Sequence, residues 1–161
     1  MPAEPAVNPS TQRVLEAARQ RGLAIEVRQF AESTRTAQEA AEAVGASLGQ
    51  IAKSVVFLAD GKPVLVLASG PNRVDTGKVA QHLGASQVRR ASADEVRATT
   101  GFAIGGVPPF GHARPLPVLF DQDLLQFETV WAAAGTANAV FAIESRRLAD
   151  ASGAVVADIK E

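Results

Sequence analysis

Apolar positions along the chain change period several times, and each change marks a predicted element. After Ser10, which we expect to cap a helix, apolar residues fall on one face until Gly22 ends the helical stretch. Residues 25–30 alternate apolar and polar side chains, as a half-buried strand does. Two capping-box patterns, separated by Gly45, then predict a helix, a break and a short helix: Thr36-x-x-Glu39 and Ser47-x-x-Gln50.

A pair of apolar runs joined by a turn is the most distinct pattern. Residues 54–59 and 64–69 are mostly apolar, and Asp60-Gly61 between them favours a tight hairpin. Two helices should follow, each opened by a capping residue and closed by a glycine: Asp75 to Gly84, and Ser92-x-x-Glu95 to Gly101.

Glycine and proline are frequent in residues 101–111, which predicts a shaped loop rather than a regular element. The pattern lacks a repeating βαβ unit and so favours an α+β fold, with a mixed, partly barrel-like β-sheet flanked by helices in a single domain. We expect residues 1–9 to form a flexible tail and residues 10–161 to form the domain. The later elements are strand-like runs at 117–120, 127–133, 139–143 and 155–159 and a short helix near 146–151.

Composition narrows the class of protein. A chain of 161 residues with 47% hydrophobic content supports one core, and the lack of Cys excludes disulfides and a cysteine nucleophile. No apolar stretch is long enough to span a bilayer, so a cytoplasmic protein without a membrane partner is expected. A net charge of −1 argues against extended binding to DNA or RNA but leaves room for a narrow contact with the end of an RNA.

Familiar catalytic motifs are nearly absent from the sequence. His82 and His112 are the only histidines, and no metal-ligand spacing, phosphate-binding P-loop or G-x-S-x-G elbow is present. We therefore expect neither a metal nor a cofactor. Any catalysis must depend on backbone dipoles and on the substrate itself.

Three segments remain as candidates, and each also has an ordinary structural interpretation. Lys53, where a short helix meets an apolar strand, is either aimed at a ligand or an ordinary surface lysine with a packed stem. The glycine loop, residues 101–111, either turns its backbone N–H groups toward an anion or closes the sheet as a long turn. Residues 134–138 connect two apolar strands and need no further role.

These segments together resemble a known family. Their motifs are similar to the signature regions of YbaK/prolyl-tRNA-synthetase-associated (INS-like) aminoacyl-tRNA editing domains, in order and spacing. Two links, Thr36-Ala-x-Glu39-Ala-Ala and Ser69-Gly-x-Asn72-Arg-Val-Asp75, add to the resemblance, which covers the chain from about residue 10 onward. The three motifs are Lys53-Ser54 before a hydrophobic strand, Gly101-x-x-x-Gly105-Gly-Val-x-Pro-Phe-Gly111, and Trp131-x-Ala-Ala-Gly135 followed by Asn138-Ala-Val-Phe141.

The resemblance implies a trans-acting hydrolase that cleaves the ester of a mischarged aminoacyl-tRNA, with tRNA-Pro as the family's usual context. It implies a pocket for the aminoacylated 3′ end and transient contact with prolyl-tRNA synthetase or the elongation machinery. Hydrolysis would use a ribose hydroxyl and a positioned water. Lys53, Gly105 and Gly106 would carry the catalytic role, and the substrate-binding residues would be Phe30, Thr36, Ser69, Asn72, Gly101, Phe102, Pro109, Phe110, Gly111, Gly135 and Thr136.

One departure from the family bears on specificity. Several relatives carry histidine or a bulkier group where this chain has Thr136. The candidates for the rejected amino acid are therefore alanine, cysteine, serine, threonine and small non-protein amino acids. Phe30 stands where some relatives have tyrosine, although a core aromatic is an equally good interpretation. Two other functions stay open: a non-catalytic nucleic-acid-binding or regulatory protein, and a pocket that senses a free amino acid or nucleotide.

Overall fold

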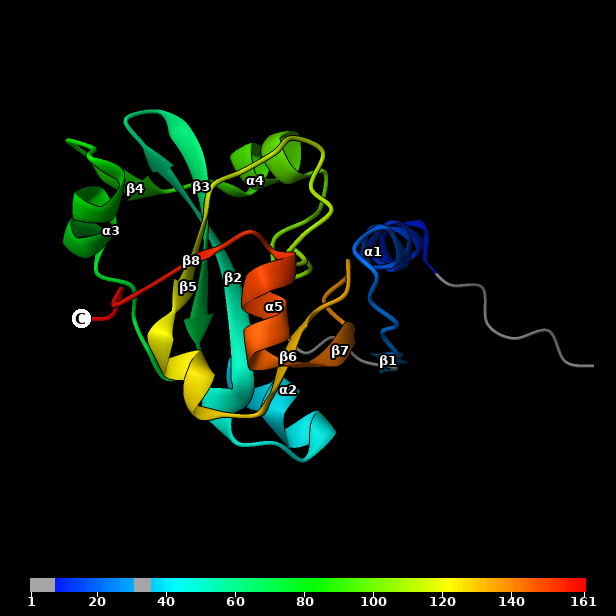
Figure 1. The fold of residues 1–161 in the computed structure, drawn as a ribbon. Helices are drawn as coiled ribbons and strands as arrows, with labels where there is room; N and C mark the ends of the chain where they lie inside the picture. Colours follow the sequence, from blue (N-terminus) through cyan, green and yellow to red (C-terminus); the bar gives the residue numbers. More distant parts are fainter. Residues whose placement is uncertain (1–7, 31–35) are drawn as a thin grey trace, which may run out of the picture.

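The computed structural model describes residues 8–30 and 36–161. Eight strands of the described chain form one mixed sheet in the order β1-β7-β6-β2-β3-β5-β8, with β4 pairing with β2 outside this path (Figure 1). The predicted central hairpin is confirmed, because β2 and β3 pair antiparallel over their whole length. The strands are β1 Val27–Gln29, β2 Ile51–Ala59, β3 Lys62–Ser69, β4 Val88–Arg90, β5 Val118–Asp121, β6 Thr129–Ala133, β7 Ala139–Glu144 and β8 Val155–Ala157.

The predicted α+β fold with a mixed sheet flanked by helices in a single domain is confirmed, and the sheet is open rather than closed into a barrel. Strands β1 and β8 lie at opposite ends of the hydrogen-bonded order, and within the described residues no pairing joins them. In residues 8–30 and 36–161, strands β1, β7 and β6 pair with the rest of the sheet only through β2, by two parallel pairs, Ile51 with Trp131 and Ala52 with Ala132. We call this short junction the seam.

Beyond the seam, strand β2 changes its neighbour on that edge. It leaves β6 after Ala52 and pairs with β4 only from Phe57 onward. Lys53, Ser54 and Val55 therefore lie where the sheet divides. Strand β4 was not predicted from the sequence, because only three residues form it and two of them are exposed arginines.

Local capping signals account for most helix boundaries. Thr36, Asp75 and Ser92 cap their helices as predicted, each accepting a bond from a backbone N–H in the first turn. The first helix differs, because Asn8 rather than Ser10 is its cap and Pro9 occupies the first helical position. The expected tail lies outside the described residues up to residue 7. The helices are α1 Pro9–Gln20, α2 Ala37–Val44, α3 Thr76–Leu83, α4 Ala93–Thr100 and α5 Ser145–Ala151, with short 3₁₀ turns η1 Leu48–Gln50 and η2 Gln122–Gln126.

Both faces of the central strands are buried, which explains their nearly continuous apolar sequence. Val56 and Leu58 of β2 join a large core with α1, α4, α5 and the glycine loop, whereas Phe57 and Ala59 join a second core with α3. Figure 1 shows α1 beside β7 and β1, far from α3 and β4. None of the helices in the described chain is long and apolar enough to cross a membrane.

Candidate functional site

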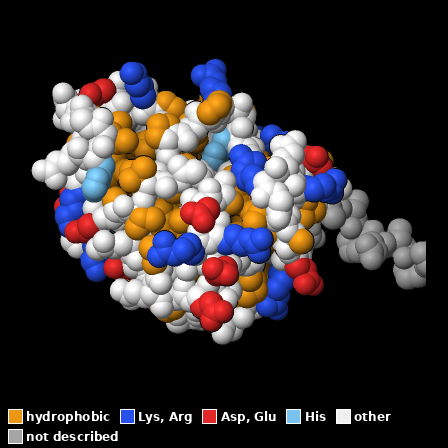
Figure 2. Space-filling view, viewed as in Figure 1, with side chains coloured by type: hydrophobic (Ala, Val, Ile, Leu, Met, Phe, Trp, Pro, Cys, Tyr) orange, Lys and Arg blue, Asp and Glu red, His pale blue; other side chains and the backbone are white. Residues whose placement is uncertain are grey.

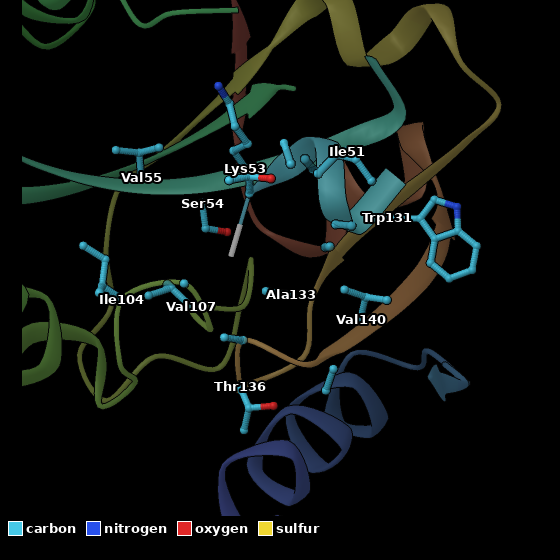
Figure 3. A pocket seen from close by; sticks show the side chains of 18 of the residues that line it. Ile51, Lys53, Ser54, Val55, Ile104, Val107, Trp131, Ala133, Thr136 and Val140 are labelled. Carbon is cyan, nitrogen blue, oxygen red and sulfur yellow. The ribbon is translucent and has the colours of Figure 1, made fainter. Parts of the chain in front are cut away.

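A cavity of about 500 Å³ opens where the sheet divides beside the seam. Its walls come from the first turn of α2, the middle of β2, strands β6 and β7 and the glycine loop (Figure 3). Most of the lining is small and apolar, and the polar side chains are few. The lining includes Thr36, Lys53, Ser54, Arg90, Ile104, Gly105, Val107, Trp131, Ala133 and Thr136.

Lys53 lines this cavity, and its ammonium lies at one margin. Figure 3 shows its side chain leaving β2 on the side opposite to Ser54 and pointing away from Thr136. The Lys53 Nζ donates to the Asn72 carbonyl oxygen at 2.8 Å. Burial lowers the pKa of Lys53 and the nearby Arg90 charge lowers it further, whereas Asp121 acts in the opposite direction. The ammonium is thus partly desolvated and held by a neutral acceptor.

Asn72 belongs to a polar network beneath Lys53. Its side-chain amide donates to Asp121 Oδ2 and to Asp123 Oδ2, both at 2.8 Å, and Lys160 Nζ reaches the same Asp123 oxygen at 2.8 Å. Ser69 joins the network, because its N–H donates to Asp121 Oδ2 at 2.9 Å and its hydroxyl donates to the Gly49 carbonyl at 2.6 Å. Neither Ser69 nor Asn72 lines the cavity. The structure therefore places both behind Lys53.

The glycine loop meets the cavity with one part only. Gly105 lines it together with Ile104, which is 51% exposed, and Val107, which is buried. Gly106 touches the neighbouring turn instead: a Cβ built there would lie 2.7 Å from Thr136 Cα and 2.8 Å from the Gly135 carbonyl oxygen. Glycine is required here by close approach of two backbones. The loop and the turn are therefore packed as one wall.

The rest of the loop is anchored away from the cavity. Phe102, Pro109 and Phe110 are buried, and Phe102 and Phe110 belong to the large core. Gly101 ends α4 in the left-handed conformation, and its carbonyl accepts a bond from the Arg13 side chain. At Gly111, a Cβ would lie 2.6 Å from the Ala17 Cβ of α1. These residues support the wall without lining it.

The turn at residues 134–138 forms the other part of this wall. Thr136 lines the cavity, and its hydroxyl donates to Asn138 Oδ1 at 2.7 Å. The Asn138 amide in turn donates to the Phe30 carbonyl at 2.9 Å, so Phe30 is joined to the turn through its backbone and does not line the cavity. Gly135 is buried against α1, where a Cβ would lie 2.7 Å from the Ser10 backbone. Helix α1 thus fixes the turn from behind.

Of the residues expected at a site, the structure brings Thr36, Lys53, Gly105 and Thr136 together around the cavity. Several lining residues were not expected there, among them Ser54, Arg90 and Trp131. The Ser54 hydroxyl oxygen is buried and has no hydrogen-bond partner among the described residues. The position of Ser54 directly after Lys53 was the only sequence signal for it. Arg90 lies on the unpredicted strand β4, and its only sequence signal was its place in a group of basic residues, Lys78, Arg89, Arg90 and Arg97, available for a narrow contact with RNA.

The charge of the cavity is positive. Lys53 and Arg90 line it, and none of the described lining residues is Asp, Glu or His. In the part of the chain that the structure describes, no group of three or more His, Asp or Glu side chains is arranged to hold a metal ion. An arrangement of two cations beside an apolar chamber suits an anionic group attached to a small apolar one.

Known proteins share this architecture. The aminoacyl-tRNA editing domain family model matches residues 31–151. The Bacillus subtilis (strain 168) protein YwhH is 38% identical over 128 residues, covering 79% of this chain and 81% of YwhH. The proline–tRNA ligase of Limosilactobacillus fermentum (strain NBRC 3956 / LMG 18251) is 38% identical over 94 residues, which are 55% of this chain and 16% of the ligase.

A solved structure extends the similarity to almost the whole chain. The protein, described as "a putative trans-editing enzyme for prolyl tRNA synthetase", has 49% sequence identity and a TM-score of 0.92, covering 97% of this chain and 99% of its own. The matched segment contains β2, the glycine loop and the 134–138 turn that enclose the cavity. This chain belongs to the aminoacyl-tRNA editing domain family.

Proposed function

We propose that this protein is a trans-acting deacylase that hydrolyses the ester bond of a mischarged aminoacyl-tRNA. One observation carries the proposal: Lys53, Gly105 and Thr136, from three distant segments, surround a single cavity of about 500 Å³. A cavity of this size takes an aminoacyl group and part of the ribose to which it is attached.

The two ends of the substrate would meet different walls. The Lys53 ammonium and the exposed Arg90 guanidinium bind the phosphate of the terminal nucleotide, because two neighbouring cations at a partly desolvated position favour an anion. The aminoacyl side chain enters the apolar part between Val107, Ala133 and Thr136. Small wall residues fit a small amino acid.

The chemistry would depend on positioning, because the described lining offers no carboxylate or imidazole as a general base. Water adds to the ester carbonyl carbon while a ribose hydroxyl assists removal of its proton. The C–O bond to the ribose then breaks, the amino acid leaves, and the ribose oxygen takes up a proton. An ester is activated relative to an amide, and the backbone N–H of Gly105 stabilises the developing oxyanion. The Gly106 N–H already donates to the Ala103 carbonyl at 3.0 Å, so Gly106 shapes the loop instead.

The tRNA is proposed to be tRNA-Pro. In support, a proline–tRNA ligase and the trans-editing enzyme described for prolyl-tRNA synthetase are among the relatives. We place the activity in the cytoplasm, where it would meet charged tRNA, with transient contact to prolyl-tRNA synthetase or the elongation machinery.

The test is a panel of tRNA-Pro and other tRNAs charged with alanine, cysteine, serine, threonine and proline. The purified protein at catalytic concentration should release one or two small amino acids from tRNA-Pro and leave the correctly charged tRNA intact. Binding without release would instead support a sensor or a non-catalytic RNA-binding protein. Release from another tRNA alone would contradict the assignment to tRNA-Pro.

A further inference from the structure

The Lys53 ammonium is held in place by a backbone carbonyl, not by a carboxylate. Its acceptor is the Asn72 oxygen at 2.8 Å, in the segment that connects β3 to α3. A backbone acceptor is only as well placed as the segment that carries it. The position of the ammonium therefore depends on what fixes residues 69–72.

Asp121 fixes that segment. Its side chain is at the end of β5 and the residue is 1% exposed. Oδ2 accepts the Ser69 N–H at 2.9 Å and the Asn72 amide at 2.8 Å, while Oδ1 accepts the Asp123 N–H at 2.9 Å. One carboxylate thus ties the end of β3, the segment behind Lys53 and the start of η2 together.

The charge of Asp121 has a second effect. A buried carboxylate is costly to desolvate, and among the described residues no cation forms an ion pair with it. The negative charge of Asp121 attracts the Lys53 ammonium, whereas the positive charge of Arg90 repels that ammonium. A neutral amide of the same shape has one acceptor oxygen where the carboxylate has two, and it also lacks this attraction. The charge is thus an addition to the structural role.

We propose that Asp121 is a positioning residue for deacylation, which fixes the Asn72 carbonyl that holds the Lys53 ammonium and offsets part of the repulsion of that ammonium by Arg90. Asp121 does not line the cavity and so would act through Asn72 and Lys53. The effect on rate rests on the proposed function. The effect on Lys53 itself does not.

The main variant is Asp121→Asn, which keeps the shape, removes the charge and turns an amide donor toward the Asn72 amide. Single-turnover deacylation should slow on the order of 10- to 100-fold, because a small misplacement of a binding group has effects of this size. The Lys53 pKa, followed by NMR of ¹⁵N-labelled lysine, should fall below the parental value. The chain has only four lysines, so the Lys53 signal is readily assigned.

Asp60→Asn is the matched control. The Asp60 carboxylate also accepts backbone N–H groups, from Ser86 and Gln87, but lies at the opposite end of the β2–β3 hairpin. The Asp60→Asn substitution should lower the melting temperature without changing the deacylation rate or the Lys53 titration. All rates are measured well below the melting temperature of each variant.

A second variant covers the case in which Asp121→Asn does not fold. Asn72→Ala keeps the Asp121 charge and the residue 72 carbonyl but removes the side-chain link between them; the rate should fall. A folded Asp121→Asn protein, or failing that Asn72→Ala, with the parental rate and parental Lys53 titration would overturn the proposal. If the parental protein releases no amino acid from any tRNA, the proposed function fails, and the Lys53 titration alone decides the role of Asp121.

Discussion

Lys53 combines a half-buried stem with a charge at the margin of the cavity, and this combination decides what its removal should do. The stem packs along β2, so truncation leaves no large hole in the core. Loss of the ammonium removes the group that we propose binds the terminal phosphate. A compact point charge and a planar guanidinium are not equivalent in such a place.

Lys53→Ala should therefore reduce single-turnover deacylation about 100-fold while the protein remains folded. Lys53→Arg should restore only part of the rate. Thermal unfolding measured beside the kinetics supplies the control. A Lys53→Ala protein that melts normally and deacylates at the parental rate would show that Lys53 is an ordinary surface lysine.

Thr136 is expected to influence which amino acid is removed. Thr136→His adds bulk and a donor to the wall, and discrimination of one methylene or hydroxyl by a pocket is worth about 1–3 kcal/mol. The ratio of rates for alanyl and threonyl substrates should change accordingly. Thr136→Val separates bulk from hydrogen bonding, since it keeps the shape and removes only the 2.7 Å bond to Asn138. An unchanged ratio in Thr136→His would place the turn outside the specificity pocket.

Some individual site residues could be predicted from the sequence, and others could not, for a physical reason. Lys53, Gly105 and Thr136 belong to motifs with a recognisable spacing, and the cavity gathers them. Trp131 belongs to one of these motifs but was not predicted to line the cavity, and Arg90 lines it only because β2 leaves β6 before it meets β4. That gap depends on pairing between distant strands, which no local pattern encodes.

Among the elements, the glycine loop and the 134–138 turn form a wall that tolerates no added atom at their contact. Gly106→Ala would place a Cβ 2.7 Å from the Thr136 Cα, so two backbones must separate. We expect a loss of about 1–3 kcal/mol in stability and slower deacylation.

Gly153→Ala is the control for this substitution. Residue 153 has a positive φ of 65°, and a Cβ there meets nothing within 4 Å. It should cost about 1–2 kcal/mol of stability through backbone strain and leave deacylation unchanged. Equal rates in Gly106→Ala and Gly153→Ala would mean that the contact at Gly106 does not shape the site.

His112 contacts the glycine loop, and its titration should make the stability of the protein depend on pH. Its Nε2 lies 2.7 Å from the Pro108 carbonyl, and burial lowers its pKa, with Arg21 adding to the effect and the Pro108 bond opposing it. The unfolded chain therefore takes up a proton at a higher pH than the folded protein does. Stability is unaffected above the unfolded-state pKa and is lost as pH falls below it toward the folded-state pKa.

The measurement is thermal unfolding of the parental protein and of His112→Gln between neutral and mildly acidic pH. Glutamine can donate to Pro108 but does not titrate, so its melting temperature should fall less, with a difference on the order of a few °C. Parallel curves for the two proteins would contradict the assignment of a lowered pKa to His112.

Helix caps and the central hairpin were predictable because their signals are local. Thr36, Asp75 and Ser92 each bond to a backbone N–H two or three residues away. At the first helix two polar residues competed, and Asn8 is the cap because Pro9 suits the first helical position. The open sheet could not be predicted from local signals, because closure depends on whether the distant strands β1 and β8 pair.

Over the whole molecule, charge is balanced rather than concentrated. The net charge is −1, and Figure 2 shows acidic and basic side chains interspersed over the face in view. Among the residues that the structure describes, Lys53 and Arg90 alone supply positive charge to the cavity lining. An RNA bound there should release few counterions.

The logarithm of tRNA affinity should therefore fall with the logarithm of salt concentration with a slope of about −1 to −3, far from the value near −10 of an extended interface. Affinities measured at several salt concentrations with intact tRNA and with an acceptor-stem minihelix provide the comparison. The two slopes should agree. A much steeper slope for intact tRNA would reveal contacts beyond the acceptor end.

The seam also governs how the molecule comes together. The chain crosses it three times, between β1 and β2, between β5 and β6 and between β7 and β8, so neither half of the sheet is a continuous piece of sequence. Contacts between distant segments form late, because long loops must close before those contacts add stability. The cavity walls come from both halves, and the single tryptophan, Trp131, pairs across the junction. We therefore expect the site to form only when the two halves of the sheet have joined, and so to be a marker of the completed fold.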